Sequence, residues 1–257
     1  DYLTSTQYNQ VKNTVRAWAN SINATPSQTY NRKVLYNSIL IMTNSLLRVG
    51  TLRNLVWGDL EVAEELTKKD QQEVHIIDVR EEANKKGEDG ARRVLSKTVE
   101  YFNRIRELSG IPKVPHSKFP HVPPEYLNKP IIKKWNKDER MGQGTWEKEW
   151  DKIKEICKKY WTVNGKEKKI TWYSFRHTGI SMGVENKIPL LTLAKFAGTS
   201  VKEIELTYYH HEEESRKTWE ILSKNRIFQN RQKKQNPEVV SFDDLLDGID
   251  AEELDAA

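Results

Sequence analysis

Two adjacent tyrosines and two adjacent histidines stand in the stretch LTYYHH, residues 206–211. A tyrosine hydroxyl has a pKa near 10, so it attacks well only where its proton is removed and the charge on the attacked group is neutralised. Consecutive side chains on a helix point about 100° apart, so only one of Tyr208 and Tyr209 can face a given site. The same geometry argues against a metal ion shared by His210 and His211.

Two arginines lie where apolar residues would be easier to place. Arg48 ends the hydrophobic run of SLLRVG, and Arg176 lies within WYSFRHTGISMGV. Two such guanidinium groups could clamp one phosphate and offset the negative charge that builds on its oxygens during attack. The alternative is that each arginine pairs with a core carboxylate or caps a helix. The sequence near both arginines contains few acids, which weakens that alternative.

A predicted β-hairpin between the arginines carries lysines at its tip. EVHIIDVR (73–80) is rich in β-forming residues, KKGEDG (85–90) is a turn cluster, and ARRVLS (91–96) is typical of a return strand. A lysine at this tip, Lys85 or Lys86, could protonate the leaving oxygen of a phosphodiester. Both would be ordinary solvated lysines if the hairpin does not form.

Helical periodicity fills most of the remaining chain. Apolar residues recur at spacings of three and four in 34–47, and WEKEWDKIKEICKKYW (146–161) carries its aromatic residues on one face. The segment 110–145 is rich in Pro, Lys and His and has little periodicity, so we expect an irregular surface segment. The predicted helical stretches are 2–22, 27–47, 97–109, 146–161 and 172–222, with a loop or small hairpin at 162–171. In 51–60 we expect a short helix that runs into a turn at Gly58-Asp59.

The charge of the chain is divided between a basic body and an acidic tail. The net charge is +5, but residues 237–257 hold eight acids and no Lys or Arg, which leaves 42 bases and 29 acids in residues 1–236. This division favours a polyanionic partner such as nucleic acid, although a merely lysine-rich soluble protein has the same composition. The single cysteine, Cys157, excludes a disulfide framework or a cysteine zinc site within one chain. No apolar run reaches the ~18 residues of a membrane helix.

The acidic tail contains a narrow amphipathic stripe. FDDLLDGIDAEEL (242–254) places four apolar residues at helical spacing on an otherwise acidic helix. Such a stripe cannot bury itself alone, so it docks on another surface or stays disordered. We therefore predict a main domain over 1–222, followed at 223–257 by a basic linker and this tail.

The order of a helix-ending arginine, a hairpin lysine, a second arginine and a tyrosine resembles the tyrosine recombinases, the phage-integrase family. LLRVGTLRNLVWGDL resembles the family's first-arginine box, with Arg48, Trp57 and Asp59 in the expected places. YSFRHTGISMGV resembles the second box, in which Tyr173 holds the first position and Arg176 is the second arginine.

A third stretch that resembles a family box favours Tyr208 over Tyr209 as the nucleophile. FAGTSVKEIELTYYHH resembles the family's tyrosine box, in which the nucleophile follows the glycine by ten residues and a histidine follows two later. Counting from Gly198 gives Tyr208 as nucleophile and His210 as its companion. Tyr209 with His211 fits one residue late and stays the alternative. The three boxes span residues 48–211.

Three positions depart from the family pattern. The family often has Glu three residues after the first arginine, whereas Thr51 stands here, so another group has to orient Arg48. Tyr173 replaces a histidine and is expected to hydrogen-bond the phosphate instead of moving a proton. Thr199 replaces the histidine of the tyrosine box and can donate only a hydroxyl. His177, directly after the second arginine, is usually structural in the family.

The resemblance implies a mainly α (α+β) catalytic domain with a small antiparallel sheet or hairpin at one edge. It implies DNA strand cleavage and rejoining through a 3′-phosphotyrosine, with no metal and no cofactor. The site residues that it implies are Arg48, Lys85 (alternative Lys86), Tyr173, Arg176, Thr199 and Tyr208 (alternative Tyr209). For contacts to the DNA backbone we expect Arg53, Lys86, Arg92, Lys169 and Lys202.

The expected partner is a double-stranded recombination site. A homotetramer is expected on DNA, with a monomer or weak oligomer when free and no membrane association. The tail is expected to dock on a neighbouring protomer or to cover the DNA surface. The protein would act on DNA in the cytoplasm, or in the host cell if it is viral. The alternatives are a type IB topoisomerase-like enzyme, a telomere resolvase, or an inactive DNA-binding protein derived from an integrase.

Overall fold

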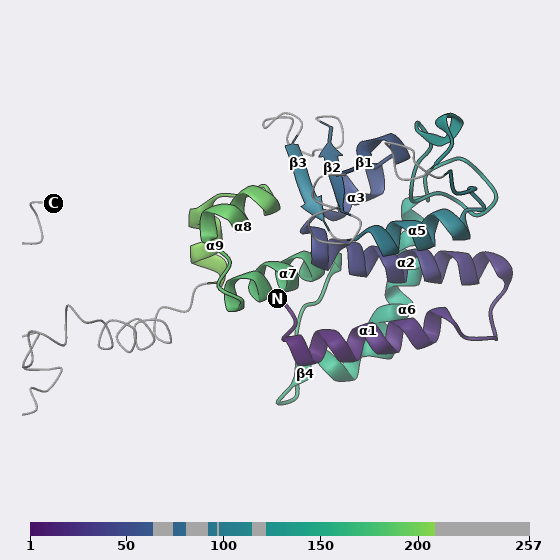
Figure 1. Ribbon diagram of the computed structural model, residues 1–257. Helices are drawn as coiled ribbons and strands as arrows, with labels where there is room; N and C mark the ends of the chain where they lie inside the picture. The colour runs from purple at the N-terminus through teal and green to yellow at the C-terminus, as the bar shows by residue number, and fades with distance from the viewer. Residues whose placement is uncertain (64–73, 81–91, 97, 115–121, 209–257) are drawn as a thin grey trace, which may run out of the picture. The chain divides into compact units, whose positions relative to one another are not determined.

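A long helix, α2 (Pro26–Ser45), is the element around which the other helices pack. The protein was analysed as a computed structural model, which describes residues 1–63, 74–80, 92–96, 98–114 and 122–208. Within it, α2 packs against α1 (Ser5–Ala19), α5 (Val99–Leu108), α6 (Gln143–Trp161) and α7 (Trp172–Glu185). Figure 1 shows α2 running between α1 and α5, with α7 leading away toward α8 (Leu190–Ala197) and α9 (Val201–Tyr208).

The remaining elements are short. Helix α3 (Val49–Asn54) follows α2 and leads through a 3-10 turn at Trp57–Asp59 into a three-stranded antiparallel sheet. Its strands are β1 (Leu60–Val62), β2 (His75–Val79) and β3 (Arg92–Ser96), in that order. A second 3-10 turn covers Pro124–Tyr126, and β4 (Thr162–Val163) pairs with β5 (Lys166–Glu167). The predicted mainly α fold class with a small antiparallel sheet is confirmed.

The first two helices begin where their side chains can satisfy free backbone N–H groups. The hydroxyl of Thr4 accepts from the backbone of Gln7, and the Gln7 side chain accepts from the backbone N–H of Thr4. Thr25 and Gln28 form the same reciprocal pair at α2, where Pro26 occupies the first helical position. These capping boxes fix the start of both helices.

Helix α2 is buried although polar residues interrupt its apolar sequence. Ser38, Thr43 and Ser45 are buried, and each donates its hydroxyl to the carbonyl four residues earlier, at 2.8, 3.0 and 2.7 Å. Bonds of this kind satisfy a hydroxyl inside a helix without a partner from another element. The polar interruptions therefore cost little here, and α2 can lie at the centre of the helical packing.

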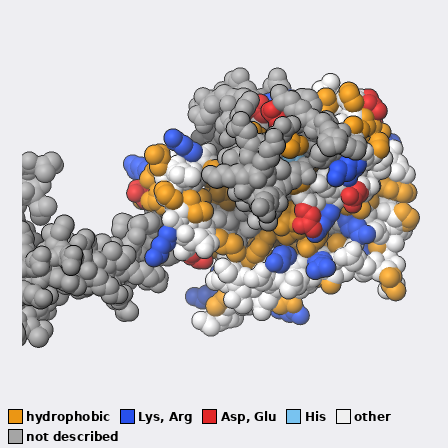
Figure 2. Space-filling view, in the orientation of Figure 1, with side chains coloured by type: hydrophobic (Ala, Val, Ile, Leu, Met, Phe, Trp, Pro, Cys, Tyr) orange, Lys and Arg blue, Asp and Glu red, His pale blue; other side chains and the backbone are white. Residues whose placement is uncertain are grey.

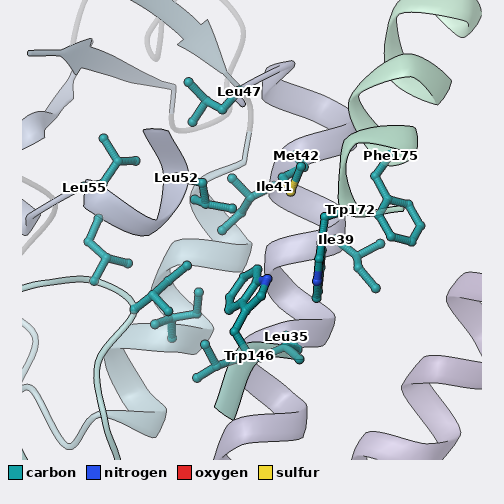
Figure 3. Close-up of a cluster of buried hydrophobic side chains, with 14 of the residues drawn as sticks. Leu35, Ile39, Ile41, Met42, Leu47, Leu52, Leu55, Trp146, Trp172 and Phe175 are labelled. Atoms are coloured by element: carbon teal, nitrogen blue, oxygen red, sulfur yellow. The ribbon is translucent and has the colours of Figure 1, made fainter. Parts of the chain in front are cut away.

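Aromatic residues of α6 and α7 fill the core on one side of α2. The Trp172 ring centroid lies 4.4 Å from that of Trp146 and 4.9 Å from that of Trp150, and Phe175 meets Trp150 edge-on at 5.9 Å. Figure 3 shows Trp172 and Phe175 next to Ile39 of α2, with Trp146 on the other side of Trp172. The aromatic face predicted for 146–161 is thus a packing surface. It anchors α7, the helix that carries Arg176.

The predicted hairpin forms in the expected place. Strands β2 and β3 pair from His75↔Ser96 to Val79↔Arg92, and β1 pairs with β2 from Leu60↔Ile77 to Val62↔His75. Burial alternates along β2, as expected for a strand with one face toward the core. The tip of this hairpin, with Lys85 and Lys86, lies outside the described residues.

The short helix predicted within 51–60 ends earlier than expected, although the turn predicted at Gly58-Asp59 is present as the 3-10 turn Trp57–Asp59. Helix α3 ends at Asn54 because the next two residues, Leu55 and Val56, adopt extended backbone and pair with a distant segment. The carbonyl of Leu55 accepts from the N–H of Ile131 at 3.1 Å, and Val56 forms an isolated bridge with Pro130. Part of the irregular segment predicted at 110–145 thus braces the end of α3.

The described elements form one compact unit that ends at Tyr208. The rest of the predicted helical stretch to 222 and the amphipathic tail at 242–254 lie outside the described residues. Among the described helices, none is long and apolar enough to cross a membrane.

The close approach of α7 to α2 at Gly179 gives a testable constraint. A Cβ at Gly179 would overlap the backbone carbonyl oxygen of Thr43 and lie 2.6 Å from Leu46 Cδ2. We expect Gly179→Ala to lower the free energy of unfolding by about 1–3 kcal/mol, as overpacking does. Urea denaturation measures it.

Gly144→Ala is the matched control for this substitution. Gly144 lies in the first turn of α6, and a Cβ there would meet nothing within 4 Å. The control is expected to leave stability unchanged or to raise it by ~0.4–1 kcal/mol. Equal effects of the two substitutions would contradict the close packing of α7 on α2.

Candidate active site

Arg176 joins the ends of two helices. It lies on α7 with 1% of its surface exposed, and its Nη2 donates to the carbonyl of Ala197 at 2.6 Å. Its Nη1 donates to the carbonyl of Leu46, the left-handed residue that ends α2. A planar guanidinium offers donors in fixed directions, so two bonds to two separate carbonyls hold it in one orientation.

The side chain of Arg48 also reaches the C-terminal end of α8. It is the residue that precedes α3, two positions after Leu46, and its Nη2 donates to the carbonyl of Gly198 at 3.2 Å. Gly198 ends α8 with φ +60°, a conformation that glycine adopts without strain. The carbonyls of Ala197 and Gly198 thus bring the two predicted arginines to the end of one helix.

The question of what orients Arg48 therefore has a structural answer. Thr51, which stands where the family often has a bracing Glu, is 2% exposed, and its hydroxyl makes no hydrogen bond among the described residues. The carbonyl of Gly198 contributes the bond to the guanidinium instead. Asp59 of the first-arginine box is also buried, and it pairs with Arg80 at 2.5 Å and accepts from the N–H of Val56 at 2.8 Å.

Tyr208 ends α9 and is packed beside Arg176. It is 7% exposed within a cluster that includes Leu46, Ile180 and Ile204. Its hydroxyl is hydrogen-bonded to Nδ1 of His177, the residue after Arg176 on α7. The resemblance to the recombinase family indicates a structural role for His177. The sequence analysis missed its contact with the candidate nucleophile. No spacing rule links residues 177 and 208, so only the fold could reveal this pair.

Burial sets the ionisation of both partners. It raises the pKa of the Tyr208 phenol above its usual value, and the positive charge of Arg176 opposes that rise. Burial, together with nearby positive charges that include Arg176, lowers the pKa of His177 to about 4. Both groups are therefore neutral at pH 7. The phenol can then donate its proton to His177 Nδ1 in the tautomer protonated on Nε2.

Tyr173 and Thr199 lie next to these groups. Tyr173 is 38% exposed, its ring meets that of His177 edge-on at 4.6 Å, and the Arg176 guanidinium lies 5.8 Å from its centroid. Thr199 directly follows Gly198 and is half-buried, and its backbone N–H donates to the carbonyl of Ala194 at 3.1 Å. The predicted set of Arg48, Tyr173, Arg176, Thr199 and Tyr208 is thus gathered around the end of α8.

Other predicted site residues cannot be placed. Lys85 and Lys86 lie outside the described residues, as do Tyr209, His210 and His211. Their roles therefore stay predictions.

The residues expected to contact DNA differ in their surroundings. The guanidinium of Arg53 donates hydrogen bonds to the side chain of Gln143 and, from Nη2 at 3.3 Å, to the carbonyl of Met141. It also lies 5.4 Å from the centroid of the Trp146 ring. Lys169 and Lys202 are exposed, and Arg92 contributes its backbone to β3. Figure 2 shows Lys and Arg side chains scattered over the visible face, with apolar side chains between them.

Comparison with solved structures identifies the fold. The XerA recombinase matches with a TM-score of 0.52 and 17% identity over 88% of this chain. The XerH site-specific recombinase, in a post-cleavage complex with palindromic difH substrate, matches with a TM-score of 0.53 and 14% sequence identity over 87% of this chain. The Tn1549 transposon integrase, in complex with transposon right end DNA, matches with 0.55 and 16% over 87%. At these identities the likeness shows that the chain has the tyrosine-recombinase fold.

The likeness covers only part of those proteins. The chain spans 66%, 53% and 66% of the XerA, XerH and Tn1549 structures, respectively. No protein-family model and no curated protein sequence matches this chain.

The buried His177 predicts a pH-dependent stability. The unfolded state takes up a proton near pH 6.5, whereas the folded state does so only near pH 4. Between these values the unfolded state binds more protons, so the free energy of unfolding falls as the pH is lowered through this window. Urea denaturation from pH 7 to pH 4 should show a smaller fall for His177→Gln, which keeps an acceptor but does not titrate. Equal slopes for the two proteins would contradict the burial of a neutral imidazole.

Proposed function

We propose that this chain is the catalytic domain of a site-specific DNA recombinase that cleaves and rejoins strands through a 3′-phosphotyrosine at Tyr208. The observation that carries the proposal is the meeting of Arg48, Arg176 and Tyr208 at the end of α8, within a tyrosine-recombinase fold. Each of the three comes from a different segment of the chain. Their meeting supports a single phosphate site.

The arginines would bind the phosphate that is attacked. As the Tyr208 oxygen approaches phosphorus, negative charge builds on the two non-bridging oxygens. The guanidinium groups of Arg48 and Arg176, already oriented by carbonyls, would stabilise that charge without reorganising. Loss of one such donor typically lowers a rate by about 10²–10³. Tyr173, exposed beside Arg176, would add a hydroxyl donor to the phosphate.

His177 would take the proton of the nucleophile. Its Nδ1 already bonds the Tyr208 hydroxyl, and a pKa of about 4 keeps its ring neutral and able to accept. The new bond joins the tyrosine oxygen to phosphorus while the bond from phosphorus to the 5′ oxygen breaks. Lys85, with Lys86 as alternative, would give a proton to that leaving oxygen. Attack by a 5′-hydroxyl reverses the sequence and releases Tyr208.

The reaction needs no external source of energy. The phosphotyrosine bond keeps the energy of the phosphodiester that it replaces, so rejoining is the reverse of cleavage. The partner would be a double-stranded recombination site, and strand exchange between two duplexes calls for a homotetramer. Two of the similar structures, the XerH and Tn1549 complexes, are bound to DNA. We place the protein on DNA in the cytoplasm or in an infected host cell.

Substitution of each tyrosine in turn tests the nucleophile. Tyr208→Phe should abolish covalent attachment to a nicked suicide duplex while leaving noncovalent DNA binding intact, because only the attacking oxygen is lost. Tyr209→Phe, one residue later, is the matched control and should still form the covalent product. A denaturing gel and mapping of the modified peptide read both results. Attachment by Tyr208→Phe but not by Tyr209→Phe would move the nucleophile to Tyr209. Binding without attachment in the unsubstituted protein would indicate an inactive DNA-binding protein.

A modified leaving group tests the hairpin lysine. Lys85→Ala should slow cleavage of an ordinary phosphodiester, because the 5′ alkoxide then leaves without a proton. A substrate with sulfur at the bridging 5′ position should restore the rate, since a thiolate leaves without protonation. Lys86→Ala is the comparison: because Lys86 is expected to contact the DNA backbone, any slowing that its loss causes should be the same for both substrates. Restoration by sulfur for Lys86→Ala alone would assign the acid to Lys86.

A further inference from the structure

A short turn between Lys133 and Arg140 has a defined shape within the segment that the sequence marks as irregular. Lys133 and Arg140 form an isolated antiparallel bridge, and the N–H of Lys134 donates to the carbonyl of Glu139 at 2.8 Å. At its tip, Asn136 has φ +55°, a left-handed conformation in which Asn is favoured among non-glycine residues. We call residues 133–140 the tryptophan turn.

Buried contacts brace the tryptophan turn from below. Lys133 is 7% exposed, and its ammonium group lies 2.9 Å from a carboxylate oxygen of Asp138, on the opposite arm. Ile132, just before the turn, and Met141, just after it, belong to the core and are joined by a backbone hydrogen bond of 3.0 Å. The turn is thus held in one conformation by its own ion pair and by its buried base.

The exposed surface of the turn combines an aromatic ring with cations. Trp135 is 41% exposed, although tryptophan is highly buried on average. Residues 129–140 hold five Lys or Arg and two acids. Both acids are already paired with lysines of the same segment: Asp138 with Lys129 and Lys133, and Glu139 with Lys134. The net charge of this segment is therefore positive, and Lys137, two residues after Trp135, is exposed.

The tryptophan turn is hydrogen-bonded to α3, the helix that directly follows Arg48. Arg140 Nη2 donates to the carbonyl of Asn54, the last residue of α3, at 3.2 Å. A six-residue helix is about 9 Å long, and an eight-residue hairpin adds at most about 10 Å. With the reach of the Arg140 side chain and its hydrogen bond to Asn54 included, about 10 Å more, the tip lies within about 30 Å of Arg48, or about nine base steps of a duplex at ~3.4 Å each.

We propose that the tryptophan turn is a DNA-contacting element beside the cleavage site, in which the Trp135 ring packs on a sugar or base and the exposed Lys137 contacts a phosphate. The inference rests on the proposed function, because a recombination site supplies the duplex. Net positive charge in the same short segment as an exposed aromatic ring favours nucleic acid over a protein surface, since the charge matches that of the phosphates while the ring contacts the apolar part. Bracing reduces the ordering that binding would otherwise require.

Fluorescence anisotropy of the full chain with labelled duplexes of about 30 base pairs, over a series of salt concentrations, tests the proposal. Trp135→Ala should weaken binding about tenfold, within the range for loss of one aromatic stacking contact, and leave the salt dependence unchanged. Trp135→Phe should keep most of the affinity. Lys137→Ala should reduce the slope of log affinity against log salt by about one. Lys152→Ala, an exposed lysine on α6, is the control and should change neither quantity.

Two results would overturn the inference and leave the proposed function standing. One is DNA affinity and cleavage by Trp135→Ala equal to those of the unsubstituted protein. The other is unchanged DNA affinity with altered sedimentation of the complex, which would assign the turn to a contact between protein copies. Failure of the unsubstituted protein to bind any duplex would instead overturn the proposed function along with it. Matching urea midpoints establish that each variant is folded.

Discussion

The bond of Arg176 to two backbone carbonyls is the contact on which the arrangement of the site depends. One carbonyl belongs to Leu46, at the end of α2, and the other to Ala197, at the end of α8. Leu46 precedes Arg48 by two residues. The hydrogen bond from Arg176 to the Leu46 carbonyl therefore also helps to fix the position of the Arg48 backbone. A neutral aliphatic residue at position 176 would leave both helix ends without their shared donor.

The packing of α7 against α2 and α6 allows Arg176 to make both hydrogen bonds. Gly179 lets α7 approach the backbone of α2 at Thr43, one turn before Leu46. On the same face of α7, one and two turns before Gly179, Phe175 and Trp172 pack into the aromatic cluster formed with α6. The helix is thus held along this face by α2 and α6, and the long side chain of Arg176 lies buried between the ends of α2 and α8. A buried guanidinium is costly unless its donors are satisfied, and the carbonyls satisfy two of them.

The same burial governs the candidate nucleophile. Tyr208 and His177 are both neutral at pH 7 because the low polarity around them disfavours charge on either. A phenol in this setting does not ionise on its own. Its proton has an acceptor one hydrogen bond away, and the arginines that would stabilise the product charge are adjacent. In the proposed reaction, proton transfer and phosphate binding are therefore linked through the short segment Arg176–His177.

The sequence by itself determined the types of residue and their order. Helix periods, the two capping boxes and the hairpin pattern are local features, which explains why the fold class and most helices agree with the prediction. The boxes around Arg48, Arg176 and Tyr208 are likewise short patterns that can be read without a fold. The turn at Gly58-Asp59 was predicted, but α3 ends earlier than expected, at Asn54, because Leu55 and Val56 pair with residues 130 and 131, far along the chain.

Only the tertiary structure decided how the site is held. The carbonyls of Leu46, Ala197 and Gly198 are among the groups that orient the two arginines, and a backbone carbonyl has no sequence signature. The contact of His177 with Tyr208, and the braced position of Trp135 beside α3, likewise join segments with no fixed spacing. Local patterns specify which side chains are present, whereas long-range packing specifies which of them meet. The chemistry proposed for this protein depends on that second step.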